Sequence, residues 1–254
     1  MNIVKRAVLI SCGSFNPPTI MHLRLFELAK DYLSINGHDI LGGIISPVHD
    51  NYKEKKQSLI PANHRIKMVE RCLQDYGFVK CSRWETQQEG WTRTRQVLEQ
   101  HLSQIKSFAN RPIFEEENSH LPERLKGISS EHINNPDLFR LFFICGGDLL
   151  ESFSVPNLWK SEDVEAIVKN FGLCVITREG SNPQKYVDNH PILKQYSNNI
   201  HIITEHITNE ISSTKIREAV RTGSSIQFFV PDPVIQYIKQ NSLYVWEMYV
   251  LKDR

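Results

Sequence analysis

Residues 5–22 of the chain read KRAVLISCGSFNPPTIMH, and this stretch decides the fold. Its apolar run at 7–11 is short and continuous, which is typical of a strand that is buried on both faces of a sheet. Thr19 is a plausible N-cap for a following helix, in which Met21, Leu25 and Leu28 recur at helical spacing. The chain is therefore predicted to open with a strand that turns directly into a helix.

The same alternation of short apolar runs and helical patterns continues along the chain. Further strands are predicted at 40–46, 78–82, 141–145, 173–177 and 200–204. Further helices are predicted from Pro61, over 87–106, after 211 and from Asp232. The pattern favours an α/β fold that is Rossmann-like, with a mostly parallel twisted sheet and helices on both faces. Ligands of such sheets bind beyond the carboxyl ends of the strands.

The composition excludes several classes of protein. The chain has 254 residues, of which 40% are hydrophobic, and a formal net charge of +1. It can bury a sizeable core, but it lacks the positive charge of a protein that coats nucleic acid or an anionic membrane. No run reaches the roughly 18 apolar residues of a membrane span, and the first apolar stretch is interpreted as a strand instead of a signal peptide.

The five cysteines form no C-x-x-C pair, which favours reduced thiols in an intracellular protein. A cytoplasmic location is the default expectation, with nuclear or mitochondrial compartments as alternatives. Residues 107–140 contain a run of glutamates and three prolines without a regular period. We interpret this segment as a flexible surface insertion in a single domain that spans residues 1–254.

The stretch 13–22 has the features of a phosphate site. A glycine at the end of a strand lets the backbone approach a phosphate, and the N–H groups that open a helix favour an anion. Thr19 and His22 are three residues apart, so both fall on one face of the first helical turn. A lone glycine and histidine would indicate only an ordinary strand–turn–helix corner, but the complete ten-residue pattern favours the phosphate site.

A second candidate anion site is ISSTKIR, residues 211–217. Hydroxyl groups at the cap of a helix are followed by Lys215 and Arg217 in its first turns, which suits phosphate oxygens. Alone, the pattern could be a capped helix with solvated basic residues. Its pairing with 13–22 in one α/β domain favours the functional interpretation.

The pattern G-x-F-x-P-x-T-x-x-H at 13–22 resembles the signature of the nucleotidylyltransferase superfamily, whose motif (H/T)-x-G-H reads Thr19-Ile20-Met21-His22 here. Met21 stands where many members have glycine, and this departure resembles the eukaryotic nicotinamide/nicotinic acid mononucleotide adenylyltransferases. The resemblance covers nearly the whole chain apart from 107–140, and it includes GDLLESF at 147–153 and VPNLWK at 155–160.

The resemblance implies a nucleotidylyltransferase domain that transfers AMP from ATP to nicotinamide mononucleotide, and to nicotinic acid mononucleotide as well. The products are NAD or deamido-NAD and pyrophosphate, with Mg²⁺ carried on phosphate oxygens and no metal site in the protein. The implied catalytic residues are His22, Lys215 and Arg217. The implied ATP- and NAD-binding residues are Gly13, Ser14, Phe15, Gly146, Asp148, Asn209, Ser212, Ser213, Thr214 and Ile216.

Two aromatic segments indicate the acceptor. A pyridinium ring is flat and positively charged, so it suits the faces of two indoles. The resemblance implies that Trp91 and Trp159 stack on this ring, and that Thr94 and the backbone of Leu158 meet its carboxamide. The alternative is that these tryptophans belong to the core. The mononucleotide-binding set implied by the resemblance also includes Lys55, Lys56 and Arg178.

Several alternatives remain open. Which lysine of 53–56 meets the mononucleotide phosphate is undecided, and a solvated basic loop is the simpler interpretation. Two rival functions remain. One is an adenylyl- or cytidylyltransferase with a different phosphate acceptor, and the other is a non-catalytic nucleotide-binding or chaperone-like protein of the same fold. A dehydrogenase is disfavoured because no G-x-G-x-x-G follows the first strand. The expected partners are ATP and the mononucleotides, with no nucleic acid, and a homo-oligomer is possible.

Overall fold

The computed structural model describes residues 4–54, 57–110, 120–126, 128–178, 182–207 and 209–245. Within these ranges six strands form one sheet: β1 (Lys5–Gly13), β2 (His38–Pro47), β3 (Val79–Cys81), β4 (Phe139–Gly146), β5 (Gly172–Arg178) and β6 (Ile200–Glu205). The order is β3-β2-β1-β4-β5-β6, and every neighbouring pair is parallel. This order is that of a doubly wound sheet, so the Rossmann-like prediction is confirmed.

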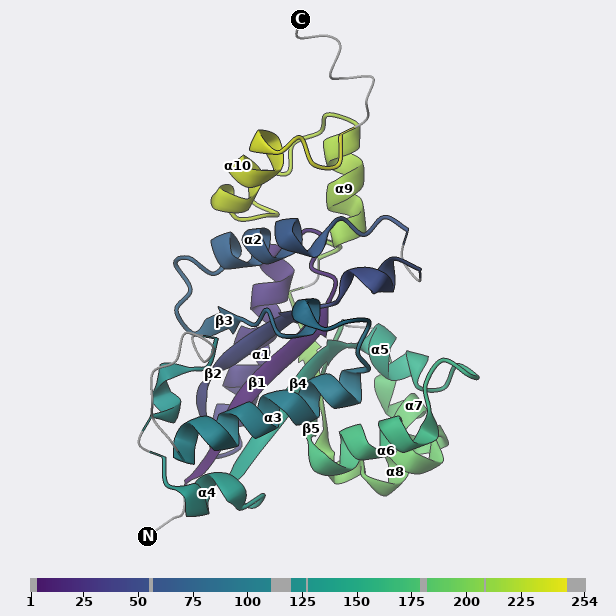
Figure 1. Ribbon diagram of the computed structural model, residues 1–254. Helices are drawn as coiled ribbons and strands as arrows, with labels where there is room; N and C mark the ends of the chain where they lie inside the picture. Colours follow the sequence, from purple (N-terminus) through teal and green to yellow (C-terminus); the bar gives the residue numbers. More distant parts are fainter. Residues whose placement is uncertain are drawn as a thin grey trace, which may run out of the picture.

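The helices connect and cover these strands (Figure 1). They are α1 (Ile20–Ile35), α2 (Ala62–Cys72), α3 (Thr94–Asn110), α4 (Ser130–Asn134), α5 (Gly147–Ser152), α6 (Ser161–Asn170), α7 (Pro183–Asn189), α8 (Pro191–Gln195), α9 (Ser213–Arg221) and α10 (Asp232–Gln240). Short 3₁₀ turns are η1 (Asp50–Glu54), η2 (Glu85–Gln87), η4 (Glu123–Leu125) and η5 (Ser197–Asn199). Among the described helices, none has the length and hydrophobicity needed to cross a membrane.

The core lies on both faces of the sheet because side chains alternate along each strand. On one face, Leu9 of β1 belongs to the same buried cluster as Phe26 of α1. On the other face, Ile10 belongs to a cluster with Leu98 of α3 and with side chains of α4 to α8. Figure 1 shows α3 crossing the front of the sheet with α1 behind it. Helices therefore cover both faces, as the sequence predicts.

A third apolar cluster lies beyond the strands. It joins Met68 of α2, Ile216 of α9 and Val234 of α10, all at most 3% exposed. In Figure 1 these three helices lie together at the end of the molecule opposite the N-terminus. The cluster attaches the C-terminal part of the chain to the region where the strands end, which is where a ligand of this fold binds.

The segment 107–140 differs from the sequence interpretation. Leu121, Leu125, Ile128 and Ile133 are at most 5% exposed and belong to the core cluster of α3. The described parts of this segment therefore contribute side chains to the core, while other side chains in them are exposed. Their apolar side chains come from short turns and a five-residue helix, so they show no regular period. Residues 111–119 and 127 lie outside the described ranges.

The start of α3 also differs from the sequence interpretation. The predicted helix begins at 87, whereas α3 begins at Thr94. A 3₁₀ turn ends at Gln87, and the chain continues as a loop through Gly90 before α3 begins. Trp91 therefore lies on a loop and not on the helix.

Candidate nucleotide-binding site

The turn after β1 is fixed by contacts from three other parts of the chain. The Gly13 carbonyl accepts a hydrogen bond from Val48 N–H at 2.9 Å. Asn16, which is fully buried, donates through its amide to the Ser58 carbonyl at 2.8 Å and accepts from the Tyr244 hydroxyl at 2.8 Å. Phe15 has φ of 45° and is 2% exposed, so its burial offsets an unfavourable left-handed backbone. These contacts hold the loop in one shape.

His22 lies in the first turn of α1, and the helix start orients its ring. Thr19 N–H donates to Nδ1 of His22 at 2.9 Å, and the Thr19 hydroxyl lies 2.9 Å from the same nitrogen. Since Nδ1 accepts from the backbone, a neutral His22 carries its proton on Nε2. The Nε2–H group is a donor that suits an anionic oxygen.

The two predicted anion motifs meet in space. The Arg217 guanidinium donates through Nη1 to the Asn16 carbonyl at 2.8 Å and through Nη2 to the Thr214 hydroxyl at 3.2 Å. The Ser213 hydroxyl donates to the Pro17 carbonyl at 2.8 Å. Partial burial lowers the pKa of Arg217, but an arginine keeps its charge in proteins. A cation, several hydroxyl groups and a helix N-terminus therefore lie beside the turn after β1.

The remaining residues of the second motif have different surroundings. The Ser212 hydroxyl caps α9 by accepting from Lys215 N–H at 3.3 Å, and Asn209 accepts from Ile211 N–H at 3.1 Å. Lys215 extends into solvent and pairs with Glu210. Ile216 is buried with α2 and α10, so only its backbone is available for the nucleotide contact that the sequence predicts.

The strand next to β1 brings Gly146 and Asp148 to the same edge. Ile10 of β1 pairs with Phe143 of β4, and each strand ends three residues later. A Cβ atom at Gly146 would lie 2.6 Å from Oδ1 of Asp148, so a side chain at this position would displace the carboxylate. The exposed Asp148 carboxylate is available to accept from hydroxyl groups of a ligand.

The two aromatic segments lie on loops, one before α3 and one between α5 and α6. Trp91 is 40% exposed, and its ring centroid lies 6.4 Å from that of Tyr52. The Trp159 indole N–H donates to the Ser152 hydroxyl at 3.0 Å, and its ring meets Phe153 edge to face at 4.9 Å. Trp159 is thus half-buried against the core. This agrees in part with the alternative that the tryptophans belong to the core.

The other residues predicted to bind the mononucleotide lie at separate places in the chain. Thr94 is the first residue of α3. Leu158 is 49% exposed, and its N–H donates to the Val155 carbonyl at 3.3 Å within its own turn. Lys55 and Lys56 lie outside the described residues, as does the side chain of Arg178 at the end of β5. The structure therefore leaves the phosphate-binding lysine undecided.

Sequence reasoning missed Arg65, a fully buried arginine in α2. Its guanidinium donates to the carbonyls of Ile60 at 2.8 Å, Ser14 at 3.1 Å and Val48 at 2.7 Å, and pairs with Asp50 at 2.9 Å. It therefore joins the turn after β1 to the loop after β2. The sequence feature that could have indicated its burial is its position four residues before Val69, on the buried stripe of the helix.

Glu85 is a second residue that sequence reasoning did not select. It is 3% exposed and accepts a hydrogen bond from the Ser46 hydroxyl at 2.9 Å. Burial raises its pKa to about 8, while the bond from Ser46 and the charge of Arg65 oppose the rise. A buried carboxyl with a raised pKa thus lies beside the carboxyl end of β2.

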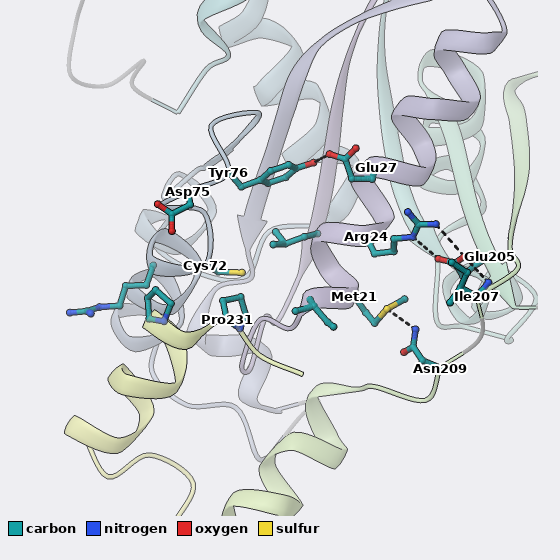
Figure 2. A pocket seen from close by; sticks show the side chains of 14 residues that line it. Met21, Arg24, Glu27, Cys72, Asp75, Tyr76, Glu205, Ile207, Asn209 and Pro231 are labelled. Carbon is teal, nitrogen blue, oxygen red and sulfur yellow. Dashed lines mark hydrogen bonds and ion pairs between the residues drawn. The ribbon is translucent and has the colours of Figure 1, made fainter. Parts of the chain in front are cut away.

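A cavity of about 520 Å³ lies along α1, away from most of the predicted site. Figure 2 shows Met21 and Asn209 at one side of it, where the Asn209 amide contacts the Met21 sulfur at 2.9 Å. Asn209 is the sole predicted nucleotide-binding residue among those that line the cavity. Arg24 there is already paired with Glu205 at 2.7 Å. The geometry of strand ends and helix caps, and not this cavity, defines the candidate site.

The donors at the candidate site suit phosphate instead of a metal ion. Among the residues that the structure describes, no group of three or more His, Cys, Asp or Glu side chains could hold a metal. The groups gathered at the ends of β1 and α9 are a guanidinium, an imidazole and hydroxyls. These are ligands for anionic oxygens.

Comparisons with known proteins show which family this chain resembles. A family model described as cytidylyltransferase-like matches residues 10–219. Nicotinamide/nicotinic acid mononucleotide adenylyltransferase 1 of Bos taurus is 44% identical over 93% of this chain and 88% of its own. Nicotinamide/nicotinic acid mononucleotide adenylyltransferase of Oryza sativa subsp. japonica is 40% identical over 94% of this chain and 86% of its own.

Two further matches extend this comparison. Nicotinamide-nucleotide adenylyltransferase of Drosophila melanogaster is 42% identical over 99% of this chain, which spans 64% of the fly protein. A crystal structure from Vibrio parahaemolyticus, named as a nicotinate-nucleotide adenylyltransferase, has a TM-score of 0.52 at 16% identity. It covers 94% of this chain and 95% of its own, which supports the fold. On the strength of the matches to curated relatives over nearly its full length, the chain belongs to the nicotinamide/nicotinic acid mononucleotide adenylyltransferase family, within the cytidylyltransferase-like proteins.

Proposed function

We propose that this protein transfers AMP from ATP to nicotinamide mononucleotide, and to nicotinic acid mononucleotide, with release of pyrophosphate and formation of NAD or deamido-NAD. The names of its relatives describe this activity. The observation that carries the proposal is the contact between the two anion motifs. Arg217 and Ser213 bond the carbonyls of Asn16 and Pro17, so both motifs lie at one strand end of the sheet.

The reaction needs alignment and charge stabilisation more than a protein nucleophile. The 5′-phosphate of the mononucleotide is itself a nucleophile that attacks the α-phosphorus of ATP in line, forming one P–O bond as the bond to pyrophosphate breaks. His22 would donate through Nε2–H to the α-phosphate, and Arg217 and Lys215 would neutralise charge on the triphosphate. Asp148 would accept from ribose hydroxyls.

The acceptor is held by the aromatic segments in this proposal. Trp91 and Trp159 would stack on the pyridine ring, with Thr94 and the Leu158 backbone at the carboxamide. Trp91 and Leu158 are both exposed enough to meet a ligand, at 40% and 49%. The mononucleotide phosphate would be bound by Lys55, Lys56 and Arg178.

Magnesium would accompany the nucleotide. The cationic and hydroxyl donors of the site fit an ATP whose phosphate oxygens carry the ion, and do not form a protein metal cage. When bound, Mg²⁺ neutralises charge that builds up on the departing pyrophosphate. The residues of the chain then hold the α-phosphate and the acceptor in line.

The test is a direct assay of the purified chain with ATP, Mg²⁺ and each mononucleotide. We expect NAD from nicotinamide mononucleotide and deamido-NAD from nicotinic acid mononucleotide, each with one equivalent of pyrophosphate. Choline phosphate and phosphopantetheine serve as alternative acceptors, and neither should be adenylylated. If neither mononucleotide gives a dinucleotide, the proposed function is wrong.

A further inference from the structure

The two segments that would contact the pyridine ring are joined by an ion pair. Arg93, which lies between Trp91 and Thr94, donates through Nη1 to Oδ2 of Asp163 at 2.8 Å. Asp163 lies in the first turn of α6, four residues after Trp159. The pair therefore connects the loop before α3 to the start of α6.

The environment of Asp163 favours this pair. Asp163 is only 8% exposed, whereas the Arg93 side chain is 40% exposed. A second guanidinium, that of Arg95, lies 3.7 Å from the other carboxylate oxygen. An almost buried carboxylate that lost its cations would be strongly destabilised, so the folded state favours the joined arrangement.

The two tryptophans have ring contacts of their own. Trp159 is held by Ser152 and Phe153, both from its own side of the site. Trp91 lies near Tyr52 of the loop after β2. The Arg93–Asp163 pair is a direct side-chain link from one segment to the other, in addition to the packing of α3 against α6.

Stacking of a ring between two aromatic faces depends strongly on their separation. Carbon atoms attract best at about 3.5–4.0 Å, and a gap wider by about 0.5–1 Å loses a quarter to a half of that attraction. Two segments that drift apart by this amount would lose much of the contact on at least one face of the ring. Spacing between the segments therefore controls the affinity for the acceptor.

We propose that Arg93 and Asp163 are positioning residues that set the spacing of the Trp91 and Trp159 segments for a pyridine mononucleotide. The proposal rests on the proposed function, because it assumes that these segments bind the pyridine ring. The pair touches neither reacting phosphate. Its effect should therefore appear in binding of the mononucleotide and not in the chemical step.

The test uses Arg93→Gln, Arg93→Lys and Asp163→Asn in the full chain. For Arg93→Gln we expect KM for nicotinamide mononucleotide to rise about fivefold to tenfold, with KM for ATP and kcat within about twofold of wild type. Arg93→Lys keeps the charge and should recover at least half of the loss. Arg83→Gln, which removes an exposed arginine paired with Glu70, is the matched control and should change neither KM.

Two further measurements separate positioning from general destabilisation. Arg93→Gln removes a partly exposed side chain and should retain its melting temperature within about 2 °C, whereas Asp163→Asn is the variant at risk of unfolding. The double variant Arg93→Gln/Asp163→Asn should raise KM no more than the larger single change, because both remove one interaction. Calorimetric titration of nicotinamide mononucleotide, without ATP, should show the same fold-change in Kd.

The outcomes distinguish this inference from the proposed function. If wild type forms NAD but Arg93→Gln leaves KM and Kd for the mononucleotide unchanged, the positioning role is refuted and the proposed function stands. An equal rise in the KM values for ATP and mononucleotide, or additive effects in the double variant, would also refute it. A wild-type protein that neither forms NAD nor binds the mononucleotide would overturn both.

Discussion

Arg217 donates to the backbone carbonyl of Asn16 at 2.8 Å, although 201 residues separate the two in the chain. Asn16 is fully buried, and its side chain is bonded to Ser58 and Tyr244. The turn after β1 is therefore shaped by the middle and by the C-terminal part of the chain as well as by its own sequence. The candidate phosphate site is assembled only when α9 docks on this turn.

His22 should matter for turnover more than for binding of the acceptor. Its Nδ1 accepts from Thr19 N–H, and in the proposed reaction its Nε2–H would donate to the α-phosphate. Removal of one preorganised donor at a reacting centre costs about a hundredfold or more in turnover. For His22→Ala we therefore expect kcat to fall at least about a hundredfold, with Kd for nicotinamide mononucleotide within about twofold of wild type.

The matched control for His22 is His64→Ala. His64 is a histidine of α2 whose Nδ1 lies 3.0 Å from the Tyr237 hydroxyl, and it has no part in the proposed chemistry. We expect the kcat of His64→Ala to stay near that of wild type. Near-normal turnover of His22→Ala in the NAD-forming assay would contradict the assigned role.

Replacement of Trp91 and of Trp159 should affect stability differently, although both are proposed to stack on the same ring. An aromatic contact contributes about 0.5–1.5 kcal/mol, so Trp91→Ala should raise KM for the mononucleotide roughly threefold to tenfold. Because Trp91 is 40% exposed, the melting temperature of Trp91→Ala should differ little from that of wild type. Trp159→Ala should raise the same KM and also lower the melting temperature, since it loses contacts with Ser152 and Phe153.

The control for the tryptophans is Phe228→Ala, which removes an aromatic ring that is 81% exposed. Initial rates at varied mononucleotide, together with thermal unfolding of each variant, provide the comparison. An unchanged KM for Trp159→Ala, with a lower melting temperature, would assign Trp159 to the core alone.

The sequence was sufficient for the elements whose signals are local. The strand at 7–11 and the cap at Thr19 follow from an apolar run and a capping residue, and both occur in the structure. Parallel pairing follows from strands that alternate with helices. The strand order was not predictable in this way, because pairing of β1 with β4 joins segments more than a hundred residues apart.

The features that could not be predicted from the sequence depend on tertiary contacts. A charged residue in a helix normally indicates a solvated face, yet Arg65 is buried because three carbonyls and Asp50 satisfy its guanidinium. The core role of Leu121 and Ile133 was hidden for a different reason. Leu121 comes from irregular backbone and Ile133 from a five-residue helix, and both are too short to show a period.

Replacement of Arg65 should lower the stability of the protein and raise KM for both substrates. Arg65→Met leaves the carbonyls of Ser14 and Val48 without their buried donor, so the free energy of unfolding should fall by on the order of 3 kcal/mol. Both loops border the site, and we expect KM to rise for ATP and for the mononucleotide. Arg83→Met, which removes an exposed arginine, is the control and should change the free energy of unfolding by less than about 0.5 kcal/mol in urea. Equal stability of the two variants would contradict the anchoring role.

Glu85 should make the stability of the protein depend on alkaline pH. Burial raises its pKa from 4.5 to about 8, so the folded state favours the protonated carboxyl. The unfolded chain loses this proton near the ordinary value. The stabilisation is therefore complete below about pH 4.5 and is lost progressively as the pH rises through about 8.

The substitution Glu85→Gln isolates this effect. Glutamine is neutral at every pH and its carbonyl can still accept from the Ser46 hydroxyl, so the variant should not lose stability across this window. We expect the melting temperature of Glu85→Gln, relative to wild type, to rise by at least about 3 °C between pH 5 and pH 8.5. Glu131→Gln, at an exposed position in α4, should show no such change. A difference between Glu85→Gln and wild type that stayed constant with pH would mean that Glu85 is charged in the folded protein, because only a proton held by the folded state and released on unfolding produces the predicted slope.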